Sequence, residues 1–419
     1  MQALFAHGRR TDETWDAAAL AAAVAEATPA AARLALEGDE GIVAAFCKVH
    51  ALMAKREHPL YEPLRTLGLA YFLGFIQSDH LRGLLARWLA AGDAGDVLVR
   101  PAGVVGHWLA GNVPILGLLS AVLSMATRNL SVLKLHESAP DTLSPFLATF
   151  TDPRLGDARE VGAALAAATL VVRADRDDAA GHRALAEQCD VRVVWGSRAA
   201  VDAVRGLASA AKPDATVVAF GPRVSACVVD PALMDDAAYA AVALDAGLFE
   251  QLACTSPHAV FVRGDAAAVR AAAARLAAAF AGLVRRGVLG GFDAFEASRV
   301  LEYRARLAID GHQVLAAPGT HYTVAVLPPG ARFTAYGYRI VACIPAPDLA
   351  GIAPLLPPSI QSLGQRLAPA DRAALVRALA GTAVCRLPAL GHMHDFELPW
   401  DGINVLERLS RRVSVGGAP

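Results

Sequence analysis

The sequence predicts an α/β protein, and two observations carry that prediction. From about residue 100, short runs rich in β-branched residues alternate with amphipathic helical runs, which is the pattern of βαβ units on a parallel sheet. Hydrophobic residues make up 55% of the 419 residues and charged residues only 19%, so most of the chain should fold into two or three domains with sizeable cores.

The first block of alternating elements follows a part that looks helical from residue 12 to about 95. That part includes an alanine-rich helix, Trp15–Glu37, and a helix that opens at Asp79 with Ser78 as its N-cap. The strands expected after it are Val104–Trp108, Ser131–Leu135, Leu170–Arg173, Val191–Trp195 and Thr216–Phe220, with helices near 114–127, 141–150, 178–188 and 198–208 between them.

A second α/β block follows. It is expected to contain a helix near 231–249, a strand at 258–263, a long helix near 265–286, a loop at 318–330, a strand at Tyr338–Ile344 and a helix near 370–380. A tail that carries proline, glycine and aromatic residues ends the chain. The two blocks therefore predict two α/β domains behind a helical N-terminal segment.

Charge and cysteine content restrict the function. The formal net charge is −1 with both signs interspersed, which leaves no basic footprint for nucleic acid or an anionic membrane. Six scattered cysteines without metal-type spacing indicate a reducing compartment. The most apolar segment, Val113–Ala126, contains Pro114 and Gly117 and is too short to span a bilayer, and the N-terminus has no signal-peptide pattern. We expect a cytoplasmic protein without membrane insertion.

Cys254 has the sequence context expected of a reactive thiol. It lies in the uncharged, small-residue segment Gln251–His258, directly before a predicted strand, where a substrate carbonyl has room to approach. The remaining cysteines lie in apolar stretches and look like small core residues. They are Cys47, Cys189, Cys227, Cys343 and Cys385. The structural alternative for Cys254 is likewise a buried core cysteine.

Five motifs occur in a fixed order along the chain. They are Trp108–Pro114 with the sequence WLAGNVP, Val132–Pro140 with VLKLHESAP, Val194–Ser197 with VWGS, Val218–Ser225 with VAFGPRVS, and the Cys254 segment. In this order they resemble the aldehyde dehydrogenase superfamily. Gly111–Pro114 and the C-terminal His394–Gly402 are more similar to the acyl-CoA reductases of bacterial bioluminescence, the LuxC family. The resemblance covers about residues 100 to 405.

The resemblance implies an aldehyde dehydrogenase-like fold with four segments. These are a helical N-terminal segment at 1–95, a Rossmann-type nicotinamide cofactor domain at 96–228, an α/β catalytic domain at 229–385, and a tail at 386–419 that packs back on the cofactor or oligomerisation region. It also implies that Cys254 attacks a thioester carbonyl and forms an acyl-enzyme. The Asn112 amide would stabilise the oxyanion, although an asparagine at this place can also simply cap the following helix.

The resemblance places further residues at the cofactor. Lys134 and Glu137 would contact the adenosine ribose, Gly196 and Ser197 the pyrophosphate, and Gly221 and Tyr336 complete the expected cofactor-binding set. A carboxylate at Glu137 repels a 2′-phosphate and favours NADH, whereas the family is associated with NADPH. We expect NADPH, with NADH as the alternative. Each residue also has a structural interpretation, since strand-end lysines and Gly-Ser turns are common.

Several polar residues are not expected to bind a metal. His107, His136 and His258 have no metal-ligand spacing, so we expect no metal site. His394, Asp395, Trp400 and Asp401 match the family's tail, but the sequence suggests no physical role for them.

Two departures from the superfamily pattern indicate the direction of the reaction. Ala219 aligns with the glutamate that activates water in aldehyde-oxidising enzymes, and Thr334 with a glutamate that anchors the nicotinamide ribose. Without the general base, the acyl-enzyme should hydrolyse slowly and accept hydride instead. We therefore expect an NAD(P)H-dependent acyl-CoA or acyl-carrier-protein reductase that forms an aldehyde, in a dimer or tetramer. The alternatives are an aldehyde-oxidising dehydrogenase and a non-catalytic paralogue that acts as a binding subunit.

Overall fold

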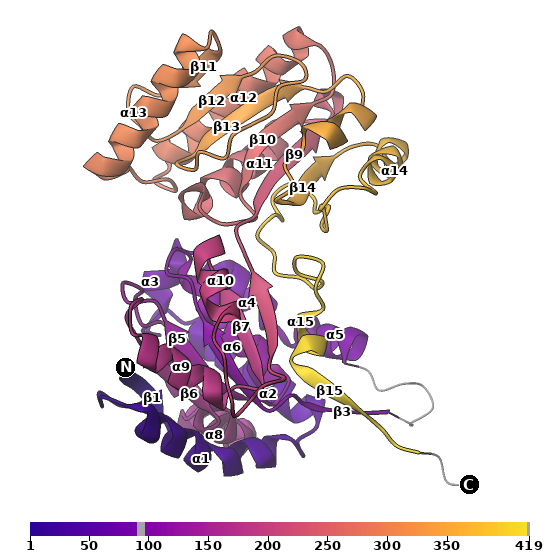
Figure 1. The fold of residues 1–419 in the computed structure, drawn as a ribbon. Helices are drawn as coiled ribbons and strands as arrows, with labels where there is room; N and C mark the ends of the chain where they lie inside the picture. The colour runs from indigo at the N-terminus through magenta and orange to yellow at the C-terminus, as the bar shows by residue number, and fades with distance from the viewer. Residues whose placement is uncertain (90–96, 417–419) are drawn as a thin grey trace. The chain divides into compact units, whose positions relative to one another are not determined.

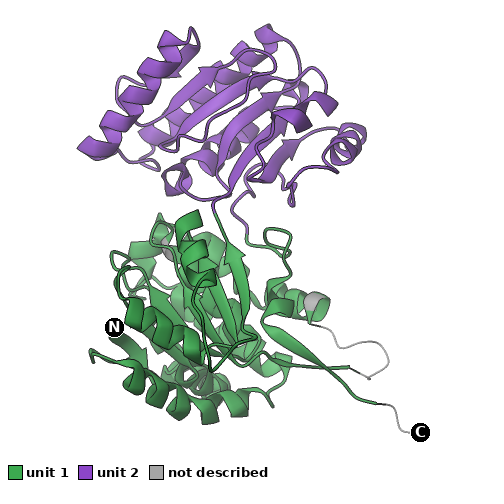
Figure 2. Cartoon of the chain, viewed as in Figure 1, with its two compact units in different colours: residues 1–221, 396–419 green, residues 222–395 purple. Residues whose placement is uncertain are grey.

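The computed structural model describes residues 1–89 and 97–416, whose helices and strands are shown in Figure 1. The chain forms two compact units, coloured separately in Figure 2. Unit 1 combines Met1–Gly221 with Phe396–Pro419, and unit 2 is Pro222–Asp395.

Unit 1 is built on a seven-stranded sheet whose central strands are parallel. Their order is β6 (Thr169–Arg173), β5 (Leu130–Leu135), β4 (Val104–Trp108), β7 (Val191–Trp195) and β8 (Thr216–Phe220). Every residue of β5 and β7 is buried, as expected of parallel strands that are covered on both faces. All five strands were expected from the sequence, and three of them have the expected bounds.

Helices cover both faces of this sheet. They are α6 (Pro114–Ala126), α7 (Leu143–Thr149), α8 (Arg159–Ala167), α9 (Ala179–Gln188) and α10 (Arg198–Arg205). Helices α9 and α10 share one apolar core with α1 and the strands, while α6 packs on β5. The sequence analysis missed α8, a nine-residue helix that follows a 3₁₀ turn at Pro153–Ala158.

The N-terminal part belongs to unit 1 and is not a separate helical segment. Strand β1 (Gln2–Ala6) pairs antiparallel with β6 and carries β2 (Arg9–Arg10) at the edge. The helices that follow are α1 (Ala17–Leu34), α2 (Asp39–Met53), α3 (Tyr61–Arg65), α4 (Leu69–Phe75) and α5 (Ser78–Trp88). Ser78 lies inside α5, whose N-cap is Gln77, so the expected cap at Ser78 is wrong.

The end of the chain returns to unit 1. Strand β15 (Ser410–Ser414), preceded by the short helix α15 (Val405–Arg408), pairs antiparallel with β3 (Val97–Pro101) in a two-stranded sheet. The structure thus groups the four expected segments differently, because β1 joins the sheet expected for 96–228. The expected boundary after residue 228 falls inside β9 (Val224–Val229).

Unit 2 contains a second parallel sheet. Its order is β11 (Gln313–Ala316), β12 (Thr323–Val326), β13 (Ile340–Pro345), β10 (Pro257–Val262), β9 and β14 (Ile360–Arg366), and only β11 runs antiparallel to its neighbour. The helices are α11 (Asp236–Gly247), α12 (Ala266–Arg285), α13 (Ala294–Ile309) and α14 (Pro369–Ala378). The prediction of a loop at 318–330 is wrong in part, because β12 lies within that range. Helix α13 was not predicted from the sequence.

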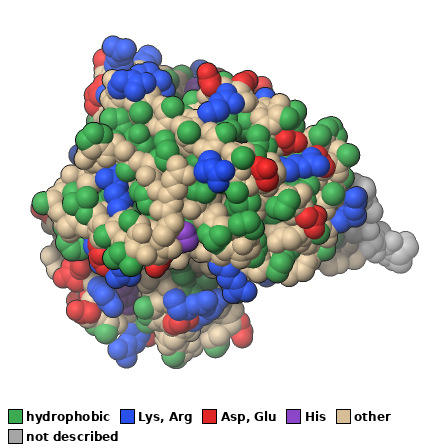
Figure 3. Space-filling model, turned by 90° about the horizontal axis from the view of Figure 1, so that it is seen from above, with side chains coloured by type: hydrophobic (Ala, Val, Ile, Leu, Met, Phe, Trp, Pro, Cys, Tyr) green, Lys and Arg blue, Asp and Glu red, His purple; other side chains and the backbone are tan. Residues whose placement is uncertain are grey.

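Helix α12 is the one described helix that is long and apolar enough, by length and composition alone, to cross a membrane. Its residues Val269, Leu276 and Phe280 are buried in the core of unit 2, and the helix contacts α11, β12 and β13. This packing is that of a core helix, and the bent pair α1 and α2 is similarly packed in unit 1. Figure 3 shows one face of the molecule, on which basic and acidic side chains are interspersed among apolar ones.

Two glycine substitutions test the packing of unit 1. A Cβ at Gly162 on α8 would lie 2.5 Å from the carbonyl oxygen of Phe150 and 2.6 Å from Leu155, so Gly162→Ala should cost about 1–3 kcal/mol. Gly83 on α5 is exposed with open space around it, so Gly83→Ala should gain about 0.5–1 kcal/mol from helix propensity. All five tryptophans belong to unit 1, so fluorescence-detected urea unfolding reports on this unit. Equal midpoints for the two variants would contradict the packing described.

Candidate active site

The expected cofactor residues of unit 1 follow the carboxyl ends of its parallel strands. Asn112 follows β4, Lys134 and Glu137 lie at the end of β5, and Gly196–Ser197 and Gly221 follow β7 and β8. Because carboxyl ends of parallel strands share one edge, these residues are gathered at the same edge of the sheet. Strand order reverses between β4 and β7, and dinucleotides bind in the crevice at such a point in doubly wound folds.

Lys134 is a buried cation at this edge. Its residue is only 7% exposed, and it pairs in register with Trp108 of β4. Burial lowers the pKa of the Lys134 ammonium, while Glu137, Asp175 and Asp178 raise it. The three carboxylates thus only partly offset the effect of burial, and the pKa of Lys134 is lowered overall.

Glu137 is exposed and is hydrogen-bonded to residues at the end of β6 and in the loop that follows it. Its Oε2 accepts a hydrogen bond from the Arg176 N–H at 3.4 Å, and its carbonyl oxygen accepts one from Arg173 at 2.8 Å. His182 orients the same loop, since its Nε2 contacts the Asp175 carbonyl oxygen at 3.2 Å and its Nδ1 accepts the Trp108 indole N–H at 3.0 Å. The sequence analysis missed His182, whose contact with Trp108 spans 74 positions.

Ser197 is the N-cap of α10, and its Oγ accepts the N–H of Ala200 at 3.3 Å. The structural interpretation of the Gly-Ser turn is thus confirmed, and a pyrophosphate role stays a prediction. A Cβ at Gly196 would lie 3.2 Å from the Ala200 Cβ, whereas the space around Gly221 is open. Beside these glycines, the rings of Trp195 and Phe220 stack with centroids 3.8 Å apart. This aromatic pair was not identified from the sequence.

Asn112 does not occupy the N-cap position of the helix that follows it. That position is Val113, whose side chain makes no capping hydrogen bond. The Asn112 residue is exposed in the turn between β4 and α6. Asn112 therefore lies one residue before the N-cap, and the oxyanion role remains the prediction for this residue.

Cys254 is half-buried in a turn directly before β10 of unit 2. Its carbonyl oxygen accepts a hydrogen bond from the Ser225 hydroxyl of β9 at 2.7 Å, and the Ser256 N–H closes the turn on the Ala253 carbonyl at 3.0 Å. Cys254 and Asn112 belong to different units, and each is described within its own.

The chain enters the Cys254 turn through an unusual backbone. Phe249, Glu250 and Gln251 have φ angles of 52°, 55° and 63°, which is the left-handed region that side-chain-bearing residues rarely adopt. Gln251 is buried, and its amide bridges the segment to β13. Nε2 donates to the carbonyl oxygens of Pro257 at 2.8 Å and Ile340 at 3.0 Å, and Oε1 accepts the Ile340 N–H at 2.8 Å. Consecutive strained residues of this kind cluster at functional sites.

Tyr336 lies in unit 2, in the loop before β13. Its half-buried ring packs against Tyr303 of α13 with centroids 4.4 Å apart. The same loop runs beside the cysteine segment, because the Tyr338 N–H donates to the Glu250 carbonyl oxygen at 3.0 Å. Burial raises the pKa of Glu250, which lies four positions before Cys254. The sequence analysis did not identify Glu250, because no motif marks it.

The other cysteines differ in part from expectation. Cys189, Cys227 and Cys343 are buried, and burial raises the pKa of Cys189 and Cys343 to about 12. Cys47 is exposed and Cys385 half-buried, so the expectation of a core position is wrong for these two.

Of the three histidines considered as metal ligands, His107 bonds to Ser120 at 2.8 Å, and burial lowers its pKa to about 3. Among the described residues, no cluster of three or more His, Cys, Asp or Glu is placed to hold a metal.

The tail motif His394–Gly402 is divided between the units. In unit 2, the His394 ring contacts the Thr255 hydroxyl at 2.8 Å and the Asp245 carbonyl oxygen at 2.8 Å. In unit 1, Phe396 stacks on Trp400 with centroids 4.3 Å apart and meets Phe75 edge-on at 5.0 Å. His394 thus lies next to the Cys254 turn, while Phe396 and Trp400 pack in the apolar core of unit 1.

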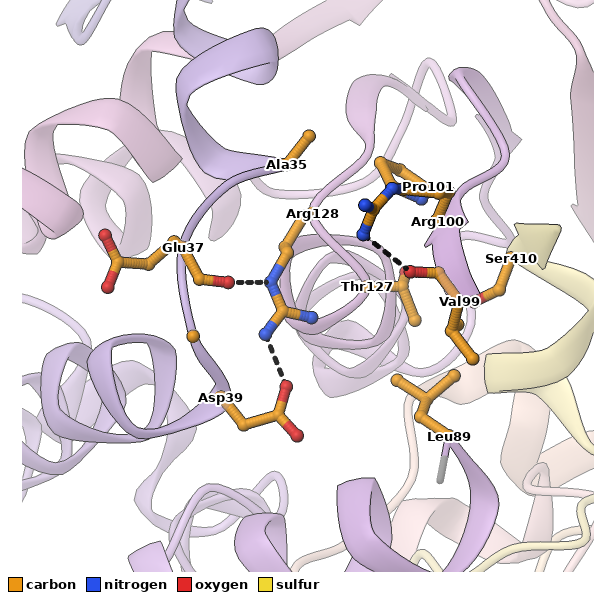
Figure 4. Close-up of a pocket in the computed structure, with 11 residues that line it drawn as sticks. Ala35, Glu37, Asp39, Leu89, Val99, Arg100, Pro101, Thr127, Arg128 and Ser410 are labelled. Atoms are coloured by element: carbon orange, nitrogen blue, oxygen red, sulfur yellow. Dashed lines mark hydrogen bonds and ion pairs between the residues drawn. The ribbon is translucent and has the colours of Figure 1, made fainter. Parts of the chain in front are cut away.

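A separate hollow of about 240 Å³ lies in unit 1, between the end of α1, the start of α2 and the β3–β15 sheet. Figure 4 shows Arg128 at its wall, where its guanidinium donates to the Glu37 carbonyl oxygen at 2.9 Å and forms an ion pair with Asp39. None of the residues that line this hollow is a predicted site residue.

The fold is that of the aldehyde dehydrogenases. The structure superposes on aldehyde dehydrogenase C of Pseudomonas syringae, solved with NAD+ and octanal, with a TM-score of 0.66 and 16% identity over 100% of this chain and 94% of that one. The putative aldehyde dehydrogenase PutA of Anabaena variabilis gives a TM-score of 0.67 with 15% identity, covering 100% of this chain and 98% of that one. The predicted fold class is confirmed.

The chain belongs to the acyl-CoA reductase (LuxC) family, whose sequence profile matches residues 81–412. Among relatives, the long-chain acyl-protein thioester reductase of Photorhabdus luminescens is 28% identical over 186 residues, which are 44% of this chain and 36% of that protein. The enzyme of the same name from Vibrio harveyi is 31% identical over 182 residues, 42% of this chain and 35% of that protein. The matched segment thus spans about a third of these relatives' length.

A buried carboxyl group of unit 2 supports a pH-dependent prediction. Asp245 on α11 has no exposed surface, and its Oδ2 accepts the Gly391 N–H at 2.6 Å. Burial raises the pKa of Asp245 to about 7, against the lowering effects of the Gly391 and Met393 N–H groups and of His392, with Asp395 adding to the increase. The folded state therefore prefers the protonated carboxyl, whereas the unfolded chain ionises near its ordinary value of 3.8.

The stability that Asp245 contributes is therefore complete below the unfolded pKa and is lost as the pH rises towards the folded pKa of about 7. Asp245→Asn keeps an acceptor for Gly391 but cannot ionise. Between about pH 5 and pH 8, the free energy of unfolding of unit 2 falls in the wild type. In the variant this fall should be smaller by up to about 3 kcal/mol. Hydrogen exchange of α11 and β10 peptides measures this, with the exposed Asp310→Asn as the control. Parallel pH profiles for D245N and wild type would contradict a raised pKa.

Proposed function

We propose that the protein is an NAD(P)H-dependent acyl-thioester reductase that releases an aldehyde. The observation that carries this proposal is Cys254, a half-buried thiol on a turn that Ser225 and the Gln251 bridge hold in place, in a chain of the acyl-CoA reductase family. The names of the relatives in that family describe the same reaction class, reduction of a long-chain acyl thioester bound to protein.

The first step is acyl transfer to Cys254. The thiolate sulfur forms a bond to the acyl carbon, the bond to the leaving sulfur breaks, and the free thiol of CoA or of a carrier protein is released. Asn112 is the proposed donor to the oxyanion of the tetrahedral intermediate. One such side-chain amide is worth about 3 kcal/mol in the transition state.

The carboxyl edge of the unit 1 sheet suits a dinucleotide. We propose that the buried Lys134 and the exposed Glu137 contact the adenosine ribose, and that Gly196 lets the pyrophosphate approach the start of α10. When bound there, a nicotinamide cofactor supplies the hydride that reduces the acyl group. Gly221 of unit 1 and Tyr336 of unit 2 are the other residues that we propose for cofactor binding.

Ala219 favours reduction over hydrolysis. It lies on β8, at the position where the aldehyde-oxidising enzymes that the sequence resembles carry a glutamate. A methyl group cannot deprotonate water, so the acyl group on Cys254 persists until it is reduced.

We assign NADPH as the cofactor, with NADH as the alternative, and CoA or a carrier protein as the acyl donor. The six free thiols support a reducing compartment such as the cytoplasm. A dimer or tetramer is the expected assembly, and we propose no nucleic-acid partner and no membrane insertion.

The test is a series of acyl-CoA and acyl-carrier thioesters mixed with the full chain and NADPH or NADH, followed by loss of reduced cofactor. At least one thioester should be reduced to an aldehyde. Cys254→Ala should lower this rate by about three orders of magnitude, because the covalent intermediate cannot form. Cys47→Ala, which removes an exposed thiol, is the matched control and should keep the wild-type rate.

Two outcomes would replace the proposal. NAD(P)-dependent acid formation from aldehydes, without thioester reduction, would make the protein an aldehyde-oxidising dehydrogenase. No turnover, no cofactor binding and an unreactive Cys254 under mild alkylation would make it a non-catalytic binding subunit.

A second prediction concerns cofactor choice. Glu137→Gln removes the negative charge that opposes a 2′-phosphate, so the ratio of kcat/KM for NADPH to that for NADH should rise about ten-fold, the equivalent of ~1.4 kcal/mol. Asp177→Asn, a change of the same charge at an exposed position of the neighbouring loop, is the control. If both variants change the ratio equally, Glu137 has no specific contact with the ribose.

A further inference from the structure

His394 is the centre of a buried chain of polar contacts in unit 2. The residue is 6% exposed, and the edge of its ring meets Phe249 with centroids 5.1 Å apart. Its Nδ1 lies 2.8 Å from the hydroxyl of Thr255, the residue after Cys254, and its Nε2 lies 2.8 Å from the carbonyl oxygen of Asp245. The proposed acyl transfer involves none of these groups directly, although Thr255 follows Cys254 in the chain.

The hydrogen-bond chemistry fixes the tautomer of His394. A carbonyl oxygen can only accept, so Nε2 carries the hydrogen and donates to Asp245. Burial lowers the pKa of His394 to about 4, so the ring is neutral at ordinary pH. Nδ1 therefore accepts the hydrogen of the Thr255 hydroxyl, and the two bonds together define how the ring and Thr255 are oriented.

The imidazole itself is firmly held. Gly391 donates its N–H to the Asp245 carboxylate at 2.6 Å, and Arg386 donates to the carbonyl oxygens of Met393 at 3.2 Å and Asp395 at 2.6 Å. Met393 packs over Gly364 of β14, where an added Cβ would lie 2.6 Å from the Met393 sulfur. The segment that carries His394 is therefore held by its own contacts, independently of the Thr255 bond.

The turn that carries Cys254 is held from two sides. On one side the Ser225 hydroxyl of β9 donates to the Cys254 carbonyl oxygen, and on the other His394 accepts the Thr255 hydroxyl. The two partners come from segments far from the turn in sequence, at separations of 29 and 139 positions. The first bond holds the peptide group that follows the cysteine, and the second holds the side chain of the next residue.

We propose that His394 is a positioning residue that fixes the Cys254 turn through the Thr255 hydroxyl, so that the thiolate is presented in one reactive orientation. This rests on the proposed function, in which Cys254 is the nucleophile. His394 does not touch the substrate in this role. Displacements of about 1 Å at a nucleophile can cost about a hundred-fold in rate, so a single orienting bond has a measurable effect.

The test separates the two bonds with variants of similar size. Thr255→Val keeps the shape of the side chain and removes the hydroxyl, and Thr255→Ser keeps the hydroxyl. His394→Asn keeps an acceptor near the position of Nδ1, and His394→Gln keeps a donor near the position of Nε2. The full chain is used throughout, and hydrogen exchange of β10 and α11 peptides checks that unit 2 stays folded.

The first readout is the rate of iodoacetamide alkylation of Cys254 against pH, located by peptide mass spectrometry because Cys47 and Cys385 are also accessible. Thr255→Val and His394→Gln should slow alkylation about ten-fold and change its pH profile, while Thr255→Ser and His394→Asn should stay closer to wild type. The second readout is turnover, in which Thr255→Val should lower kcat about ten-fold with little change in KM.

Wild-type alkylation rates in both Thr255→Val and His394→Gln would overturn the proposal. Loss of reactivity in Thr255→Ser equal to that in Thr255→Val would also overturn it, because the hydroxyl would then be irrelevant. Alkylation needs neither acyl donor nor cofactor. If no thioester is reduced, the proposed function fails, and the alkylation series still decides the role of His394.

Discussion

The Cys254 turn depends on the buried amide of Gln251. Three consecutive left-handed residues, Phe249–Gln251, lead into the turn, and each costs about 1–2 kcal/mol relative to an ordinary helical or extended conformation. The Gln251 amide makes three hydrogen bonds, to Pro257 and to both peptide groups of Ile340, each with a net contribution of about 1 kcal/mol. These terms are of similar size. The Gln251 bridge to β13 thus offsets much of the cost of this shape, and its burial excludes water as a competing partner.

Sequence patterns could predict the parallel strands of unit 1 and the polar residues at their carboxyl ends for one physical reason. A parallel strand buried on both faces must be a run of β-branched and other apolar residues, as β5 and β7 are, and its polar ligand-binding residues follow its carboxyl end. Lys134 and Ser197 therefore stand out as polar residues directly at the ends of apolar runs. Short elements lack this contrast. Strand β12 has only four residues between proline and glycine, and the pairing of β1 with β6 is a contact between distant segments.

The candidate residue Cys254 of unit 2 could be selected from the sequence, but the geometry of its turn could not. Cys254 is recognisable by its neighbours, whereas the positive φ angles before it occur at residues that ordinarily avoid that conformation, so no local preference reveals them. The same holds for His394. Its bond to Thr255 joins positions 139 apart, and a histidine in a tail motif gives no sign of which loop it will meet.

The boundary between the two units falls within the tail motif, which explains how the motif's residues are used. The boundary falls between Asp395 and Phe396, so consecutive residues serve different cores. His394 is bonded to Thr255, the residue after Cys254, in unit 2, while Phe396 and Trp400 are stacked in the apolar core of unit 1. One short segment is thus anchored at both ends by buried contacts. Phe396 is two residues from His394 in the chain, so this segment joins the apolar core of unit 1 to the hydrogen bond that His394 makes with Thr255.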